Sequence, residues 1–91
     1  MKRVRARILI EGRLQNINFR YYTQQQAKTL GLQGFVRNLS DGRTEIEVQG
    51  NEEKVEQMLE WCQQEPHSSF IKRILFRYDE TVDRYTDFTV R

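Results

Sequence analysis

One short segment and one amide carry the residue types that handle phosphate. The segment Gly12–Arg20 follows an apolar run, precedes a helix-compatible stretch and ends on Arg20. A loop at a strand-to-helix junction can direct backbone N–H groups, a helix N-terminus and a guanidinium at one point, which suits a phosphate. Asn38 stands at the end of another expected strand, just before a tight turn. These two markers predict a small enzyme that handles phosphate without a metal ion and without a covalent nucleophile.

The composition excludes several classes of protein and site. The chain has 91 residues and a net charge of +2, so we expect one domain over residues 1–91 with one modest core and no nucleic-acid partner. No apolar run approaches the ~20 residues of a membrane helix, so no membrane partner is expected. The run Ile8–Ile10 is too short for a signal peptide, which favours a cytoplasmic location. One cysteine, Cys62, and one histidine, His67, cannot form a disulfide or a zinc site, and we expect no metal and no cofactor.

Apolar periodicity predicts the elements that flank the phosphate-handling segment. The apolar side chains of a first strand alternate in sequence and share one face: Val4, Ala6, Ile8 and Ile10. The arginines between them share the other face, where Glu45 and Glu47 can pair with them across strands. The stretch Tyr21–Leu30 has helical spacing and is followed by Gly31, a common residue after a helix.

A hairpin, a second helix and two more strands follow. Gly34–Leu39 and Arg43–Gln49 have strand character, and the Asp-Gly pair between them signals a tight turn. Asn51 is placed to cap a second helix. The apolar stripe of that helix is Val55, Met58, Leu59 and Cys62. Phe70–Tyr78 is rich in β-formers, and we expect Phe88–Arg91 to form a last short strand that buries Phe88 and Val90.

The order strand, helix, strand, strand, helix, strand, with a short terminal strand, indicates the fold class. It is the split βαβ, or ferredoxin-like, arrangement of α+β proteins. We therefore predict a mainly antiparallel sheet with both helices on one face. Outside the expected elements, His67 is predicted to be an exposed loop residue without a role.

The two motifs resemble those of the acylphosphatase family. Gly12–Arg20 resembles the pattern G-x-V-Q-G-V-x-F-R, and Gly34–Gly42 resembles G-x-V-x-N-x-x-D-G. Further similar segments are Tyr22–Thr23, Ala27–Gly31, Val48–Gly50 and Phe88–Arg91, so the similarity spans nearly the whole chain in order. The chain departs from the first pattern where Asn16 replaces a glycine and where Asn18 occupies a position that is often small.

The resemblance implies a monomeric enzyme that hydrolyses an acyl phosphate to a carboxylate and inorganic phosphate. In it, Arg20 matches the arginine that binds the phosphoryl group, and Asn38 matches the asparagine that positions the attacking water. Inorganic phosphate is then expected as product and competitive inhibitor. The backbone N–H groups that match the phosphate cradle belong to Gln15, Asn16, Ile17, Asn18, Phe19 and Arg20.

The departures in the loop lead to one conformational prediction and leave two other functions open. A cradle of converging N–H groups needs residues with positive φ, so we expect Asn16, and also Asn18, to be left-handed. The substitutions leave open, as an alternative, a non-catalytic anion-binding module that keeps the fold. An RNA-binding sheet of the same topology is disfavoured, because Thr44–Val48 has no aromatic residue and two outward carboxylates.

Overall fold

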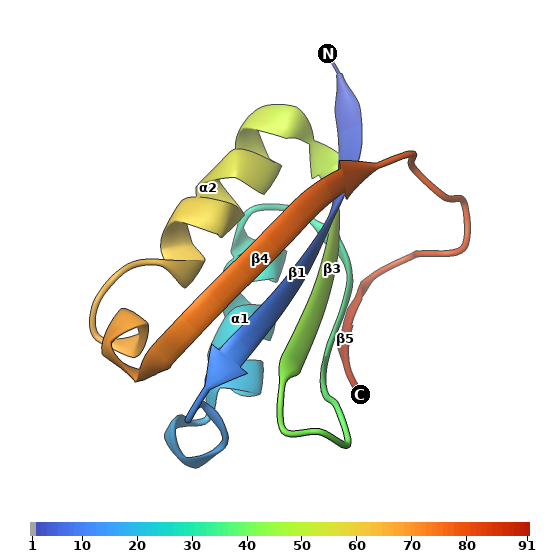
Figure 1. Cartoon of the computed structure of the whole chain (residues 1–91). Coiled ribbons are helices and arrows are strands. Elements are labelled where there is room, and N and C mark those ends of the chain that lie inside the picture. The colour runs from blue at the N-terminus through green and yellow to red at the C-terminus, as the bar shows by residue number, and fades with distance from the viewer. Residues whose placement is uncertain (1) are drawn as a thin grey trace.

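The protein, described by a computed structural model over residues 2–91, is an α+β structure (Figure 1). At Asn16 the model describes the backbone, which is part of a short helix, but not the side chain. The elements in chain order are β1 (Arg3–Gly12), the 3-10 helix η1 (Gln15–Ile17), α1 (Phe19–Thr29), β2 (Gln33–Asn38), β3 (Thr44–Asn51), α2 (Glu52–Cys62), the 3-10 helix η2 (His67–Phe70), β4 (Ile71–Asp79) and β5 (Phe88–Val90).

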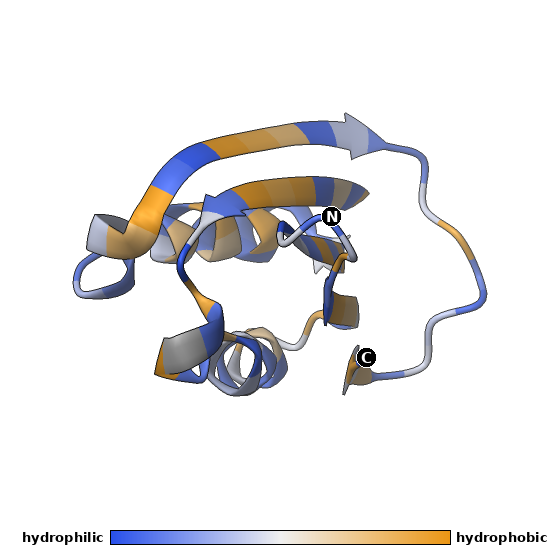
Figure 2. Ribbon diagram, turned by 60° about the horizontal axis from the view of Figure 1, so that its bottom comes forward, coloured by the Kyte–Doolittle hydropathy of each residue, from blue (hydrophilic) through white to orange (hydrophobic). Residues whose placement is uncertain are grey.

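The strands form one five-stranded sheet in the order β4-β1-β3-β2-β5. Neighbouring strands are antiparallel, except that β5 runs parallel to β2. Both helices lie on the same, concave side of this sheet (Figure 2). The prediction of a ferredoxin-like α+β fold is therefore confirmed. In the described part of the chain, no helix has the length and apolarity needed to cross a membrane.

The core lies between the sheet and the helices and follows the predicted periodicity. All four apolar side chains of the first strand, Val4, Ala6, Ile8 and Ile10, are buried. The predicted stripe of α2 is buried as well: Val55, Met58, Leu59 and Cys62. Cys62 lies wholly in apolar surroundings, and this burial raises the pKa of its thiol to about 12.

Local chemistry sets the ends of both helices. The Asn51 side chain caps α2 by accepting a hydrogen bond from the Glu53 backbone N–H at 2.9 Å, as predicted. Gly31 ends α1 with φ 71, and the Leu32 N–H donates back to the Ala27 carbonyl at 2.9 Å. Only a residue without Cβ adopts that φ at little cost, which explains why the helix stops there.

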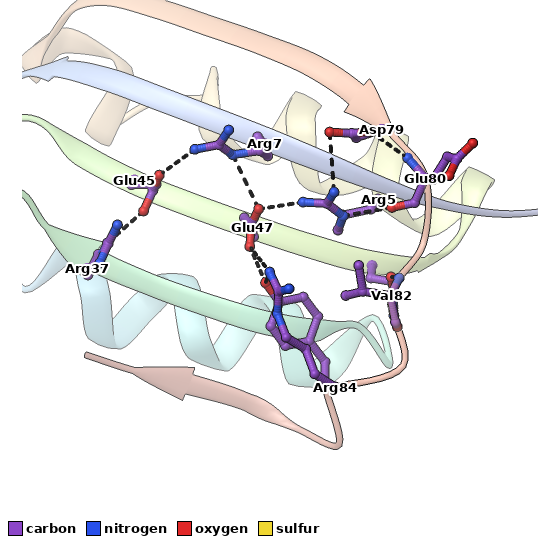
Figure 3. Close-up of polar contacts among 11 residues, drawn as sticks. Arg5, Arg7, Arg37, Glu45, Glu47, Asp79, Glu80, Val82 and Arg84 are labelled. Atoms are coloured by element: carbon purple, nitrogen blue, oxygen red, sulfur yellow. Dashed lines mark hydrogen bonds and ion pairs between the residues drawn. The ribbon is translucent and has the colours of Figure 1, made fainter.

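The face of the sheet away from the helices is covered by side chains and by the chain between β4 and β5 (Figure 3). Glu45 and Glu47 point to this face as expected, but both are buried rather than solvated. Arg5 donates to Glu47 at 2.6 Å and Arg7 donates to Glu45 at 2.9 Å, which confirms the predicted pairing. The Tyr85 hydroxyl also donates to Glu47, so the loop before β5 is held against the sheet.

Two predictions about the burial of single residues were wrong. Val90 is 41% exposed, because it is the last residue of the short edge strand β5 and lines a cavity. His67 is 9% exposed, because η2 folds back onto the end of α2. There the His67 ring packs on Trp61, with 4.5 Å between ring centroids, and its Nε2 bonds the Trp61 carbonyl.

Candidate active site

A cavity of about 270 Å³ lies where the N-terminus of α1 meets the end of β2. It brings together Arg20 and Asn38, the two residues that the sequence motifs singled out. Its lining consists of Leu14, Gln15, Asn18, Phe19, Arg20, Tyr21, Asn38 and Val90. Of the other expected cradle residues, Ile17 packs against the core instead, and the side chain of Asn16 lies outside the described part.

The end of β1 directs the loop toward this cavity. At Gly12 a Cβ atom would lie 2.2 Å from the Phe70 carbonyl oxygen, so only glycine allows the two segments to approach so closely. The next residue, Arg13, donates its backbone N–H to that same carbonyl at 2.9 Å. From there the chain turns through η1, and the Gln15 side chain donates to the Gly42 carbonyl at 2.9 Å. The loop is thus tied to both η2 and the β2–β3 hairpin.

Asn18 is the left-handed residue of the loop, with φ 57 and ψ 35. It separates η1 from α1, and its carbonyl accepts the bond from Tyr22 N–H at 3.2 Å. The left-handed conformation expected at Asn18 is therefore present. Asn16, for which the same was expected, lies within the 3-10 helix η1, which is a right-handed form. Asn18 alone therefore makes the turn for which two left-handed residues, Asn16 and Asn18, were expected.

The turn at Asn18 lets α1 begin at Phe19, two residues earlier than predicted. Arg20 consequently belongs to the first helical turn and not to the loop. The N–H groups of Phe19, Arg20 and Tyr21 precede the Tyr22–Asn18 bond, and N–H groups at this end of a helix lack intrahelical partners. All three residues line the cavity. Free N–H groups and the positive end of the helix dipole favour an anion there.

Arg20 reaches the cavity from the first turn of α1 and is exposed to solvent. Its Nη1 donates to the Arg91 carbonyl at 2.9 Å, which places the guanidinium beside the end of β5. The sequence motifs did not indicate this partner, because a backbone carbonyl carries no residue-type signal. Its only sequence cue is the predicted terminal strand.

Asn38 is the last residue of β2 and lies opposite Thr44 of β3. The Thr44 hydroxyl donates to Asn38 Oδ1 at 3.2 Å, and Thr44 is 1% exposed. The bond joins the oxygen of the amide to β3, while Asn38 also lines the cavity. The sequence motifs did not indicate this contact. The signal that would reveal this contact is the register of the hairpin, which sets Thr44 directly across from Asn38.

An aromatic cluster supports the first turn of α1 from the side of the core. Phe19 is 2% exposed and stacks on Trp61 with 5.6 Å between ring centroids. His67 packs against both rings. This cluster anchors Phe19, the residue before Arg20, so the buried His67 helps to position the helix end. Among the described residues, no group of three or more His, Cys, Asp or Glu side chains is arranged to hold a metal ion.

Comparison with known proteins identifies the family. The family model for acylphosphatase matches residues 6–90. An acylphosphatase from Chloroflexus aurantiacus is 36% identical over 90 residues, which cover 99% of this chain and 98% of that protein. One from Thermococcus kodakarensis is 40% identical over 80 residues, or 88% of each chain. The crystal structure of acylphosphatase from Bacillus subtilis superposes with a TM-score of 0.88 at 28% identity, covering 97% of this chain and 98% of that one. This chain therefore belongs to the acylphosphatase family.

Proposed function

We propose that the cavity is the active site of an acylphosphatase, in which Arg20 and the first N–H groups of α1 bind the phosphoryl group and Asn38 positions the attacking water. Membership of the family confirms the enzyme class: hydrolysis of an acyl phosphate to a carboxylate and inorganic phosphate. The observation that carries the residue assignment is that Arg20 and Asn38, which come from two separate motifs, line one cavity at a helix N-terminus.

The chemistry of an acyl phosphate explains how a site with so few functional groups can hydrolyse it. An acyl phosphate is a mixed anhydride whose leaving group is a carboxylate, and a carboxylate is a weak base that departs without a strong general acid. Water attacks phosphorus as the bond from phosphorus to the acyl oxygen breaks. Such a transfer needs mainly positioning and stabilisation of charge on the equatorial oxygens. Arg20 and the α1 N–H groups supply donors for that charge.

Asn38 supplies orientation rather than proton transfer. An amide is not a useful base, so its contribution is to hold a water in line with the phosphorus. Thr44 limits the rotation of this amide through the bond at 3.2 Å. The water proton is released to solvent or to a phosphate oxygen once attack has begun.

The size of the cavity indicates which part of the substrate it holds. At about 270 Å³ it is smaller than the ~300–1,000 Å³ typical of sites that enclose a drug-sized ligand. It has room for a phosphoryl group, the attacking water and the first atoms of the acyl part, and it is too small to enclose a long acyl chain. We therefore expect the enzyme to bind substrates by the phosphoryl group and to accept different acyl chains.

The remaining predictions from sequence belong to this proposal. We expect a single copy over residues 1–91 to be the catalytic unit, because Arg20 and Asn38 of the same chain line one cavity. Inorganic phosphate presents the same oxygens as the substrate, so we expect it to inhibit competitively. A cytoplasmic location stays a prediction.

Hydrolysis of benzoyl phosphate by the purified protein, measured with and without a metal chelator, tests the proposal. We expect turnover that the chelator does not change and that inorganic phosphate inhibits competitively. Loss of turnover with chelator and its return with magnesium would contradict the proposed mechanism. Binding of phosphate without any turnover would instead support the non-catalytic anion-binding module.

A further inference from the structure

Two exposed apolar side chains of this protein lie at the cavity of the candidate active site. They are Tyr21 and Val90, which are 55% and 41% exposed, and both line the cavity. The chemistry proposed at phosphorus uses neither side chain. Apolar and aromatic side chains that line a ligand cavity bind the apolar parts of the ligand. Their place at the cavity therefore indicates a contact beyond the phosphoryl group.

The two side chains come from elements that meet at this cavity. Tyr21 belongs to the first turn of α1, directly after Arg20. Val90 pairs with Val36 in the parallel register of β5 and β2, and Val36 is fully buried beneath the helices. Val90 therefore projects to the same face of the sheet, the face on which α1 lies (Figure 2). We call Tyr21 and Val90 together the apolar rim.

Two hydrogen bonds fix the rim before a ligand binds. The Gln24 side chain donates to the Phe88 carbonyl at 3.2 Å, and Arg20 Nη1 donates to the Arg91 carbonyl at 2.9 Å. The two donors are about one helical turn apart on α1, and the two acceptors lie on either side of Val90 in sequence. These bonds hold β5 against the start of α1, so the rim is preorganised and little entropy is lost when a ligand contacts it.

The charge of the cavity separates the two parts of a substrate. Among the described residues that line the cavity, Arg20 alone carries a charge, and in the proposed mechanism the phosphoryl group takes it. The acyl substituent follows the phosphoryl group by two atoms, the bridging oxygen and the carbonyl carbon. The cavity has room only for the first atoms of the acyl part, so the substituent leaves it where exposed side chains line it. Tyr21 and Val90 are the large apolar ones among these.

We propose that the apolar rim binds the acyl substituent, and that Tyr21 and Val90 make the enzyme prefer acyl phosphates with an aromatic or other bulky apolar acyl group. This inference rests on the proposed function and adds the class of substrate. A phenyl ring, as in benzoyl phosphate, packs on the Tyr21 ring and against the Val90 methyl groups, and the contact removes apolar surface from water. The single methyl group of acetyl phosphate covers much less of the rim.

The rim affects binding rather than the chemical step. Attack breaks the bond between phosphorus and the acyl oxygen, and the substituent keeps its contacts while this happens. A contact that is equal in the ground state and the transition state lowers KM without raising kcat. We therefore expect Tyr21→Ala to raise KM for benzoyl phosphate about threefold more than KM for acetyl phosphate. The ratio of the two kcat values should stay as in the wild type.

Binding of two unreactive analogues, measured by calorimetry, tests the rim directly. Phenacylphosphonate and acetonylphosphonate have a CH2 group in place of the bridging oxygen of benzoyl phosphate and acetyl phosphate, and they differ only in phenyl against methyl. We expect the wild type to bind phenacylphosphonate about tenfold more tightly, and inorganic phosphate to displace both. Tyr21→Ala should lower this preference about threefold, and Val90→Thr, which keeps the shape but adds a hydroxyl, should do the same.

Tyr22→Ala is the matched control. Tyr22 is the next residue of α1 and is 54% exposed, but it lines a different cavity, so this variant should keep the tenfold preference. An unchanged preference in Tyr21→Ala and Val90→Thr, or an equal loss in Tyr22→Ala, would overturn the proposal. So would an equal loss of affinity for both analogues, because the side chains would then act on the phosphoryl site.

The same measurements separate the rim from the proposed function. A preference for phenacylphosphonate that depends on Tyr21 and Val90, without turnover of benzoyl phosphate, would support the rim and contradict the proposed active site. Turnover of benzoyl phosphate with equal binding of the two analogues would overturn the rim alone.

Discussion

The conformation of Asn18 can be tested by substitution more sharply than any other feature of the loop. Its φ of 57 and ψ of 35 lie in the left-handed region, and α1 begins at the next residue. Valine at this position meets two penalties, because a Cβ atom disfavours this region and β-branching restricts the side chain further. Glycine meets neither, although it loses more chain entropy on folding.

These conformational penalties set the expected changes in the free energy of unfolding. A left-handed residue with a Cβ atom costs about 1–2 kcal/mol, and asparagine is among the residues that tolerate the conformation best. We expect Asn18→Val to lower the free energy of unfolding by about 1–2 kcal/mol relative to the wild type. Asn18→Gly should stay within about 1 kcal/mol of it. One kcal/mol corresponds to a change in Tm of about 4–8 °C for a domain of ~60–100 residues.

Thermal unfolding and inhibition by inorganic phosphate are the two measurements. Asn18→Val should lower Tm, and it should weaken phosphate inhibition, because a loop that leaves the left-handed region turns the first N–H groups of α1 away from the cavity. Asn18→Gly should retain phosphate inhibition. Equal Tm and equal inhibition for the valine and glycine variants would refute the role of this conformation.

Three further predictions concern Thr44, Glu45 and Phe88. Thr44→Val replaces the hydroxyl that donates to Asn38, and such a bond contributes about 0.5–1.5 kcal/mol, so kcat should fall about 2–10-fold. Inhibition by phosphate should be unchanged, and Thr44→Ser should restore kcat. An unchanged kcat in Thr44→Val would show that Thr44 does not position Asn38. Burial opposes ionisation of Glu45, but hydrogen bonds from Arg7 and Arg37 outweigh it and hold its pKa below the ordinary 4.5. Its ionisation therefore stabilises the fold above about pH 4.5, and the Tm difference between wild type and Glu45→Gln should shrink as the pH falls below that value; a constant difference would contradict this. Phe88 is fully buried, so Phe88→Ala should lower the free energy of unfolding, measured with denaturant, by about 3–5 kcal/mol. Val90 is exposed, so Val90→Ala should change it by less than about 0.5 kcal/mol. Similar losses in the two variants would show that both side chains belong to the core.

Periodicity and capping chemistry were enough to predict the fold. The alternation in β1, the stripe of α2, the cap at Asn51 and the stop at Gly31 depend on neighbours in sequence, and the structure retains all of them. The hairpin and the order of elements then determine a ferredoxin-like sheet. Local signals of this kind are strong because each can be satisfied in only one type of element.

Tertiary contacts account for what the sequence did not predict. The burial of His67 depends on η2 folding back onto Trp61, two positions whose proximity no short-range pattern encodes. Glu45 is buried because Arg7 and Arg37 reach it from two neighbouring strands. The bond from Arg20 to the Arg91 carbonyl joins the end of the first motif to the residue after β5, and its acceptor is a backbone atom.

The sequence predicted which two residues belong to the candidate site but not the geometry of the loop that forms it. Arg20 and Asn38 were identified from sequence, and the structure brings both to one cavity. The shape depends on where the left-handed turn falls, and this is at Asn18 rather than at Asn16. Since the turn moves the start of α1, it also changes which N–H groups face the cavity.

A comparison of Arg20→Gln with Asn38→Ala tests the central claim most directly. Both residues line the cavity, but only Arg20 carries a positive charge, which the proposed mechanism uses to bind phosphate. With benzoyl phosphate as substrate, Arg20→Gln should lower kcat and weaken competitive inhibition by inorganic phosphate. Asn38→Ala should lower kcat by about 100-fold through loss of water positioning, with the inhibition constant for phosphate unchanged. An equal loss of phosphate affinity in both variants, or full activity in either, would contradict this division of roles.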